Sequence, residues 1–288
     1  MNTTTEPVLR VSGLSARIGN AQLVRDVGFE VHRGRTLAVV GESGSGKSIT
    51  AAAIMGILPP QIQVGGSVLF DGTELLREPP KRRRARGGAE IGYVFQEPMS
   101  ALHPLLRIGT QMIRPLRYHL GLSRNDARSR AAELLDQVGL GAERNVLDAY
   151  VHELSGGMRQ RVMIAMAISC GPRLLLADEP TTALDPTVQQ QILRLLARLR
   201  EELDLALLLI SHDLGLVARY SDEVLVMYDG RVVEHGPTKQ IIEQPAEPYT
   251  RALIEAAPRL GRRLDRLPTI DTAVLEQTRN RAMAGGAR

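Results

Sequence analysis

A glycine-rich segment in the N-terminal part of the chain has the composition and spacing of a phosphate-binding loop. Residues 41–48 read Gly-Glu-Ser-Gly-Ser-Gly-Lys-Ser and fit the pattern G-x-x-x-x-G-K-[ST]. Glycines let backbone N–H groups curve around a polyphosphate, and the N-terminus of a following helix adds a favourable dipole. The pattern lets Lys47 reach the β- and γ-phosphates and makes the Ser48 hydroxyl a ligand for Mg²⁺. The segment therefore predicts a site for a nucleoside triphosphate.

Two adjacent acidic residues end a second informative segment. Leu174–Ala177 is a continuous apolar run of strand length, and Asp178 and Glu179 follow it directly. Such a run is typical of a parallel strand that is buried on both faces. An acidic residue at the end of such a strand, beside a phosphate loop, can hold Mg²⁺. A second carboxylate can polarise a water for attack on the γ-phosphate. We therefore predict Asp178 as a metal ligand and Glu179 as the general base.

A third segment, Leu-Ser-Gly-Gly-Met at 154–158, precedes a helical pattern. Ser155 can cap that helix, while Gly156 and Gly157 leave its first backbone amides exposed. Read alone, the segment is most simply a helix cap, and a second anion site is the alternative. Its position shortly before the acidic pair favours the anion site.

The elements that must position these residues follow an α/β pattern. Alternating or apolar runs predict strands, and apolar residues at helical spacing predict helices. The predicted strands are 8–14, 28–31, 36–40, 68–70, 91–95, 174–177, 205–210, 224–227 and 232–234. The predicted helices are 49–58, stopped by Pro59, and then 126–138, 158–169 and 187–202. We expect a helical insertion between about Glu97 and Gly171, and the segment 174–210 reads as a βαβ unit.

Composition excludes several classes of protein. The chain has 288 residues, a net charge of +4 and nine aromatic residues without a tryptophan, which does not favour base stacking on nucleic acid. The single cysteine, Cys170, excludes an internal disulfide framework or a multi-cysteine metal site. No apolar run reaches the roughly 18–20 residues of a membrane helix, and the N-terminus lacks the pattern of a secretory signal. We therefore expect a soluble, cytoplasmic protein without a nucleic-acid partner.

The positive charge is concentrated near the C-terminus. Residues 259–288 hold seven arginines and three acidic residues, which accounts for the whole excess. We expect residues 1–258 to be neutral overall, despite the basic run at 81–84. The stretch 259–288 is predicted to be a solvated basic tail, with anionic lipid headgroups or a partner subunit as its alternative contacts.

The ordered set of motifs resembles the ATP-binding cassette (ABC) family. In that family a Q-loop glutamine, an L-S-G-G signature, a D-loop and a switch histidine follow the phosphate loop in this order. The matching residues are Gln96, Leu154–Gly157, Ala183–Asp185 and His212. The resemblance covers about residues 8–240. It implies an α/β fold with the mostly parallel sheet core of P-loop NTPases, an antiparallel β subdomain and an inserted α-helical subdomain at about 97–171. The ATPase domain would span 1–258.

The resemblance also implies how the site works with ATP and Mg²⁺. Family members pair head to tail, so each ATP lies between the phosphate loop of one subunit and the signature of the other. The residues implied for nucleotide binding are Gly41, Glu42, Ser43, Gly44, Ser45, Gly46, Lys47, Ser48, Ile49 and Ile18, together with Ser155, Gly156, Gly157 and Asp185 from the partner-facing set. Catalytic roles fall to Lys47, Gln96, Glu179 and His212, and metal binding to Ser48, Gln96 and Asp178. Because one chain carries one set of motifs, a second copy or a relative has to complete each site.

One residue departs from the family pattern. Ile18, just before Gly19, lies where these ATPases usually place an aromatic side chain that stacks on adenine. Isoleucine packs apolar surface but offers no π-face, so we expect adenine contact to be weaker or to come from elsewhere.

Within the family, several segments resemble the ATPase subunits of bacterial peptide and nickel uptake systems. They are Phe95–Pro104, Ser155–Ala165, Ala177–Asp185 and Glu247–Leu253. Many peptide-type members continue into a cysteine-containing C-terminal stretch. Because Cys170 is the only cysteine, we expect that stretch to be absent, which favours the nickel or metallophore branch. The expected function is to energise uptake of di- or oligopeptides or of nickel or other metal chelates.

The resemblance implies partners that the chain does not contain. They are two transmembrane permease subunits and, acting through them, an extracytoplasmic solute-binding protein, which places the chain at the cytoplasmic face of the cell membrane. In importers of the family, the segment after the Q-loop receives a helix of the permease, so Pro98–Leu116 is the expected docking groove.

Three alternatives stay open at this point. An exporter ATPase subunit would differ by the absence of a solute-binding protein encoded beside it. Soluble ABC ATPases without a transport role usually carry tandem cassettes, coiled arms or metal hooks. A P-loop kinase has no use for the signature or the D-loop.

Overall fold

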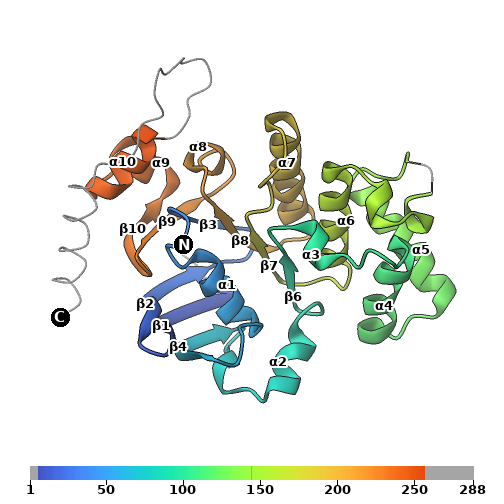
Figure 1. Ribbon diagram of the computed structural model, residues 1–288, viewed down its shortest axis with the longest axis horizontal. Helices are drawn as coiled ribbons and strands as arrows, with labels where there is room; N and C mark the ends of the chain where they lie inside the picture. Colours follow the sequence, from blue (N-terminus) through green and yellow to red (C-terminus); the bar gives the residue numbers. More distant parts are fainter. Residues whose placement is uncertain (1–5, 144, 257–288) are drawn as a thin grey trace. The chain divides into compact units, whose positions relative to one another are not determined.

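The computed structural model describes residues 6–143 and 145–256, which form two compact units. The first unit comprises 6–78 and 208–256, and the second comprises 79–207 (Figure 1). Strand β8 (Ala206–Ser211) crosses from the second unit into the first. The basic tail expected at 259–288 lies outside the described residues.

An antiparallel sheet in the first unit has the strand order β2-β1-β4-β5. These strands are β1 (Leu9–Ile18), β2 (Ala21–Val31), β4 (Ile62–Phe70) and β5 (Thr73–Glu74). Leu9 pairs with Val31 on one side and Phe70 on the other, and all three side chains are buried. The strands predicted at 28–31 and 68–70 are therefore only the ends of longer strands. The earlier part of β4 escaped prediction because Gly65 and Gly66 weaken a strand pattern.

The first unit also holds β10, β9, β3 and the end of β8, side by side in that order. Here β3 is Thr36–Val40, β9 is Glu223–Tyr228 and β10 is Arg231–Pro237. β3 runs parallel to β9, while β9 and β10 form the predicted antiparallel hairpin. Every residue of β3 and of β8 is buried, as expected of apolar strands covered on both faces.

Short helices complete the first unit. They are α1 (Lys47–Met55), η1 (Leu75–Arg77), α8 (Leu214–Val217), α9 (Thr238–Glu243) and α10 (Pro248–Ala256). The prediction that Pro59 stops the first helix was wrong. α1 ends at Met55, because Gly56 adopts a left-handed φ of 74° and its N–H donates to the carbonyl oxygens of Ala52 and Ala53.

The second unit combines parallel strands with a run of helices. β6 (Ile91–Val94) and β7 (Leu174–Asp178) are parallel. The first residue of β8, Ala206, donates its N–H to the carbonyl oxygen of Arg173, just before β7, at 2.9 Å. The helices of this unit are α2 (Pro80–Arg86), α3 (Pro98–Ala101), α4 (Ile108–Leu120), α5 (Arg124–Gln137), η2 (Val146–Asp148), η3 (Val151–Glu153), α6 (Gly156–Ile168) and α7 (Pro186–Glu202). The predicted α/β fold with helices inserted between strands is thus confirmed.

The inserted helices α4, α5 and α6 lie together (Figure 1). Ile108, Met112 and Leu116 recur at every fourth position of α4 and are fully buried. The sequence pattern missed α4 because Pro115 lies in its interior, where proline removes a helical hydrogen bond. Among the described residues, no helix combines the length and the hydropathy needed to cross a membrane.

Glu74 fixes the turn between β5 and η1 in the first unit. Its carboxylate accepts hydrogen bonds from Val68 N–H at 2.9 Å, from Leu76 N–H at 3.1 Å and from the Ser67 hydroxyl. Burial opposes the charge, yet these hydrogen bonds and the nearby Arg77 hold the pKa of Glu74 below its ordinary value.

Glu74→Gln should therefore lower the free energy of unfolding by about 1 kcal/mol at neutral pH, because a neutral amide oxygen accepts the two backbone N–H groups more weakly than a carboxylate and loses the attraction to Arg77. A carboxylate whose folded pKa is depressed stabilises the protein above its unfolded pKa of about 4.3, and this stability is lost as the pH falls through the folded pKa. Urea unfolding should thus show a gap between variant and wild type that shrinks in acid. Glu143→Gln, at an exposed carboxylate, is the control. An equal difference in the free energy of unfolding at neutral and at acidic pH would contradict the lowered pKa of Glu74.

Candidate functional site

The predicted phosphate loop lies between β3 and α1 in the first unit. Gly41 and Gly46 have φ angles of +152° and +99°. A Cβ atom on Gly41 would stand 2.2 Å from the carbonyl oxygen of Met227, and one on Gly46 would stand 3.0 Å from that of Leu23. Both positions require glycine, since the backbone is left-handed and neighbouring strands approach closely.

Lys47 begins α1 and is only 4% exposed. Its ammonium donates to the carbonyl oxygens of Gly41 at 2.9 Å and Glu42 at 2.8 Å. A buried ammonium needs such acceptors, because losing water without replacement costs several kcal/mol. The first turn of α1 carries no acidic side chain that would compete for the positive end of the helix dipole.

The residues around this loop fit a polyphosphate. A hollow of about 250 Å³ is lined by Glu42, Ser43, Gly44, Ser45, Tyr228 and Asp229. The loop and the first turn of α1 contain all nine residues that were predicted to bind the phosphates, Gly41, Glu42, Ser43, Gly44, Ser45, Gly46, Lys47, Ser48 and Ile49. Left-handed glycines, a helix N-terminus and a buried lysine together form an anion cradle.

The other predicted residues of the first unit lie on separate elements. Ile18 ends β1, where it pairs with Ala21 and Ile62, and its side chain is 43% exposed. His212 follows β8 directly and is exposed. The next residue, Asp213, caps α8 by accepting from Leu216 N–H at 3.0 Å, which fixes the backbone on which His212 stands.

The acidic pair lies at the end of β7 in the second unit. Asp178 is 5% exposed and accepts a 3.0 Å hydrogen bond from the hydroxyl of Tyr93 on β6. Burial, followed by the charge of Asp178, raises the pKa of Tyr93 well above its ordinary value. The phenol therefore stays protonated and remains a donor to the carboxylate of Asp178.

Glu179 turns away from the strand direction with a left-handed φ of 43°. A non-glycine residue in this conformation costs roughly 1–3 kcal/mol and recurs at functional sites. One oxygen of its carboxylate, Oε2, accepts from Gln96 Nε2 at 3.2 Å and from Thr182 Oγ1 at 2.9 Å. The structure thus brings together the predicted base and the predicted Q-loop glutamine.

The signature and the D-loop also meet within the second unit. Ser155 caps α6 by accepting from Met158 N–H at 3.3 Å. A Cβ atom on Gly157 would stand 2.9 Å from a methyl group of Val188 on α7, and one on Gly156 would stand 3.3 Å from Leu184. Small residues here let the start of α6 approach α7, while Ser155 and Gly156 stay exposed.

Asp185 performs a structural task at the same place. Its Oδ1 atom accepts from the backbone N–H groups of Thr187 and Val188, both at 3.0 Å, and so caps α7. The residue was predicted to contact nucleotide across a subunit interface. Its side chain is exposed, so capping fixes its position and leaves Oδ2 open to a partner.

Sequence reasoning missed two side chains of this network, Tyr93 and Thr182. Tyr93 is a polar-tipped residue within an otherwise apolar strand, and Thr182 lies three residues after Glu179. These are the signals that could have found them. The partners of these two side chains, Asp178 and Glu179, depend on how β6, β7 and the turn after β7 pack together.

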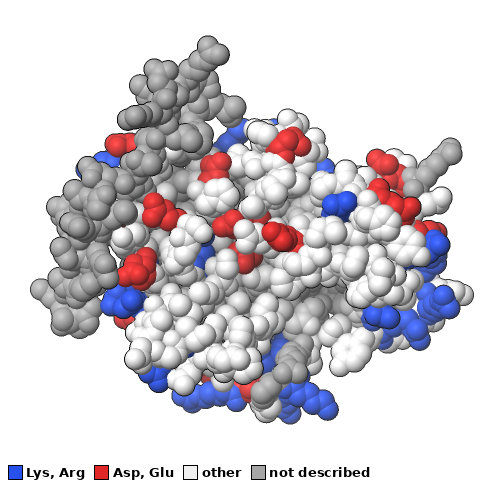
Figure 2. Space-filling view, viewed as in Figure 1, with Lys and Arg blue, Asp and Glu red and all other residues white. Residues whose placement is uncertain are grey.

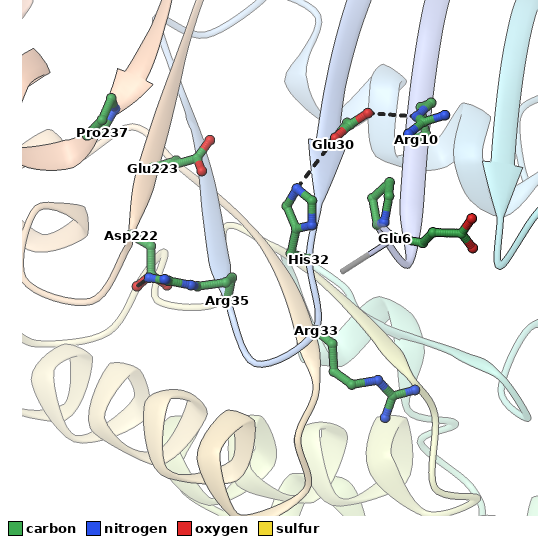
Figure 3. Close-up of a pocket in the computed structure, with 10 residues that line it drawn as sticks. Glu6, Arg10, Glu30, His32, Arg33, Arg35, Asp222, Glu223 and Pro237 are labelled. Atoms are coloured by element: carbon green, nitrogen blue, oxygen red, sulfur yellow. Dashed lines mark hydrogen bonds and ion pairs between the residues drawn. The ribbon is translucent and has the colours of Figure 1, made fainter. Parts of the chain in front are cut away.

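Another hollow of the first unit lies away from these residues. It has about 760 Å³ and is lined by charged side chains (Figure 3). Glu30 bonds both Arg10 at 2.6 Å and His32 at 3.4 Å, and Arg35 bonds Asp222 at 2.9 Å. Exposed pairs of this kind contribute little to stability, and the hollow contains no predicted site residue.

Comparison with known proteins places this geometry in a family. A family model described as ABC transporter matches residues 24–182, which is more than half of the chain. The chain belongs to the ABC transporter family. As such it is an ATPase, and the resemblance inferred from its motifs is confirmed.

Individual relatives and one solved structure agree with this. A Brucella abortus (strain 2308) protein, provisionally named a peptide import ATP-binding protein, is 48% identical over 280 residues, covering 96% of this chain and 84% of that protein. The oligopeptide transport ATP-binding protein OppD of Salmonella typhimurium is 47% identical over 242 residues, covering 84% of this chain and 72% of OppD. The dimeric post-hydrolysis state of the ATP-binding cassette MJ0796, bound to ADP and Pi, has a TM-score of 0.71 at 27% identity, covering 80% of this chain and 98% of that one.

One expectation about this ABC ATPase has to be corrected. A second model, described as the C-terminal region of oligopeptide/dipeptide transporters, matches residues 233–286. The expectation that the C-terminal stretch of peptide-type members is absent was wrong, because the region is present without cysteines. The argument that favoured the nickel or metallophore branch therefore fails.

The hydrogen bonds of Glu179 generate a graded prediction. Glu179→Gln should reduce kcat for ATP by at least about 100-fold, because an amide cannot act as a base. Thr182→Val keeps the base but removes one hydrogen bond that orients it, so kcat should fall about fivefold with KM for ATP nearly unchanged. Thr187→Val, at an exposed threonine of α7, is the matched control for steady-state assays. Wild-type turnover in Glu179→Gln would refute the assigned base.

Proposed function

We propose that the chain is the ATP-hydrolysing subunit of an importer that takes up di- and oligopeptides. The observation that carries the substrate class is the match of residues 233–286 to the C-terminal region of oligopeptide/dipeptide transporters. The names of the relatives in Brucella and Salmonella support the same class and the direction of import. Uptake of nickel or another metal chelate is the alternative that the transport experiment below distinguishes.

The roles of the phosphate loop follow from its donors. Backbone amides at the start of α1 bind the phosphates of ATP, and Lys47 exchanges the carbonyl oxygens of Gly41 and Glu42 for phosphate oxygens. The Ser48 hydroxyl, Gln96 and Asp178 are the proposed ligands of Mg²⁺, which neutralises charge on the phosphates when bound. Few protein ligands suffice, since Mg²⁺ keeps waters and phosphate oxygens in its shell.

Glu179 is the proposed general base. Gln96 and Thr182 hold its Oε2 atom and so orient the carboxylate, which accepts a proton from the attacking water. The hydrogen bond from Gln96 connects this base to the segment that follows β6. His212 is proposed to contact the γ-phosphate, and apolar contact with adenine is proposed for Ile18.

A second ATPase subunit completes the site in this proposal. Ser155, Gly156 and Gly157 form a capped helix start at which Ser155 and Gly156 are exposed, as an anion site on a partner surface requires. Asp185 keeps one carboxylate oxygen open beside them. The dimeric state of the MJ0796 cassette supports a paired arrangement, with either a second copy or a relative as partner.

The proposed membrane partners are two permease subunits, with this chain at the cytoplasmic face and a solute-binding protein acting through them. The segment Pro98–Leu116 exposes two large apolar side chains, Met99 at 47% and Leu105 at 78%. Lys and Arg side chains gather nearby over α4 and α5 (Figure 2). This apolar and basic surface is the proposed docking site for a permease helix.

Leu105→Asp should weaken assembly with the permease subunits at least about tenfold, because a charge replaces an exposed apolar contact at the proposed interface. ATP binding by the isolated chain should not change. Co-purification with the membrane subunits measures assembly. Leu203→Asp, at an exposed leucine that follows α7, is the control. Equal recovery of both variants in the complex would place docking elsewhere.

The substrate class is tested in proteoliposomes that contain the chain, its neighbouring permeases and the solute-binding protein. We expect a peptide-loaded binding protein to stimulate ATP hydrolysis several-fold and to drive peptide into the lumen. Stimulation by a nickel-loaded binding protein alone would move the proposal to metal uptake. Stimulation by neither would contradict import.

A further inference from the structure

The C-terminal region reaches the phosphate loop through one buried side chain. Tyr249 lies in the first turn of α10 and is fully buried. Its hydroxyl oxygen accepts a 3.1 Å hydrogen bond from the backbone N–H of Glu42. The two residues are 207 positions apart in the sequence, and Tyr249 belongs to the stretch that matches the C-terminal region of oligopeptide/dipeptide transporters.

This hydrogen bond acts on the same peptide group as Lys47. The peptide that joins residues 41 and 42 presents its carbonyl to the Lys47 ammonium, at 2.9 Å, and its N–H to Tyr249. A peptide group is planar, so fixing both of its polar ends fixes its orientation. The orientation of this peptide sets where the loop leaves β3 and where its following amides point.

Tyr249 is itself held firmly. Its ring contacts that of Tyr228, at the end of β9, with the ring centroids 4.7 Å apart. Before α10, the carboxylate of Glu234 on β10 accepts from Ala246 N–H at 2.7 Å and from Glu247 N–H at 3.3 Å. Burial raises the pKa of Tyr249 above its ordinary value, so the hydroxyl stays neutral near the anion cradle.

We propose that Tyr249 is a positioning residue for ATP binding, through which the C-terminal region presets the first peptide of the phosphate loop. Two hollows among the described residues give weaker support for a further site. In the hollow of about 760 Å³, Arg10, His32 and Arg35 pair with acidic side chains of the same lining. Nothing shows what would fill the arginine-lined hollow on α4. The proposal rests on the proposed role of the loop in binding ATP, and it adds that residues far outside the motifs tune the affinity.

The test uses the full chain and MgATP as the probe. Tyr249→Phe keeps the ring and its contact with Tyr228 but removes the acceptor of Glu42 N–H. We expect the Kd for MgATP, measured by calorimetry, and the KM of ATP hydrolysis to rise about three- to tenfold, with kcat at saturating ATP within about twofold of wild type. Tyr118→Phe, at a tyrosine that is 79% exposed, is the matched control and should change neither.

A second variant tests the same path without touching the loop. Glu234→Ala removes the acceptor that anchors the start of α10, so KM for ATP should rise while kcat is kept. A Kd for MgATP that stays at the wild-type value in Tyr249→Phe overturns the proposal, even if the nucleotide-free chain melts at a lower temperature. A fall in kcat at constant KM overturns it as well. Failure of the wild-type chain to bind MgATP would instead refute the proposed function of the loop.

Discussion

The burial of one ammonium group governs the architecture of the first unit. Lys47 is 4% exposed, and an unpartnered charge in that position would be strongly destabilising. Its acceptors are carbonyl oxygens of the loop itself, so the loop has to curl back over the start of α1. That path is open only to glycine at positions 41 and 46, where β9 and β2 leave no room for a side chain. The buried lysine and the two glycines together therefore fix the curved path of the loop.

In the second unit, two carboxylates are likewise held by hydrogen bonds. Asp178 is buried and paired with a tyrosine hydroxyl, and Glu179 is turned by a left-handed backbone toward Gln96 and Thr182. The capped helices α6 and α7 present the signature and the D-loop side by side on the same unit. The chain carries only one copy of each of these motifs. This is the physical basis for expecting a second subunit.

What the sequence could predict were the features that depend on neighbours in the chain. The phosphate loop, the acidic pair and the capped signature helix are local patterns, and the structure forms all three. Helix α4 was not predicted because Pro115 lies in its interior, where proline is unfavourable. Helix α1 was predicted too long because the left-handed Gly56 ends it before Pro59 is reached. Tyr93, Thr182 and Tyr249 could not be assigned, since their partners are chosen by packing between strands or across 207 residues. The C-terminal stretch was misjudged because its cysteines were taken as its defining feature, whereas the match extends over 233–286 without them.

The central claim, that each ATP site combines the phosphate loop of one subunit with the signature of another, has a direct test by complementation. Lys47→Ala and Gly157→Glu variants are each inactive as ATPases in this account, the first through the loop and the second through the signature. Mixed in equal amounts with the membrane subunits, they should regain a substantial part of the wild-type ATPase rate, because one of the two sites in a mixed pair has both halves intact. The double variant mixed with either single variant should stay inactive. Absence of recovery in the mixture of single variants would contradict a site shared between two copies of this chain.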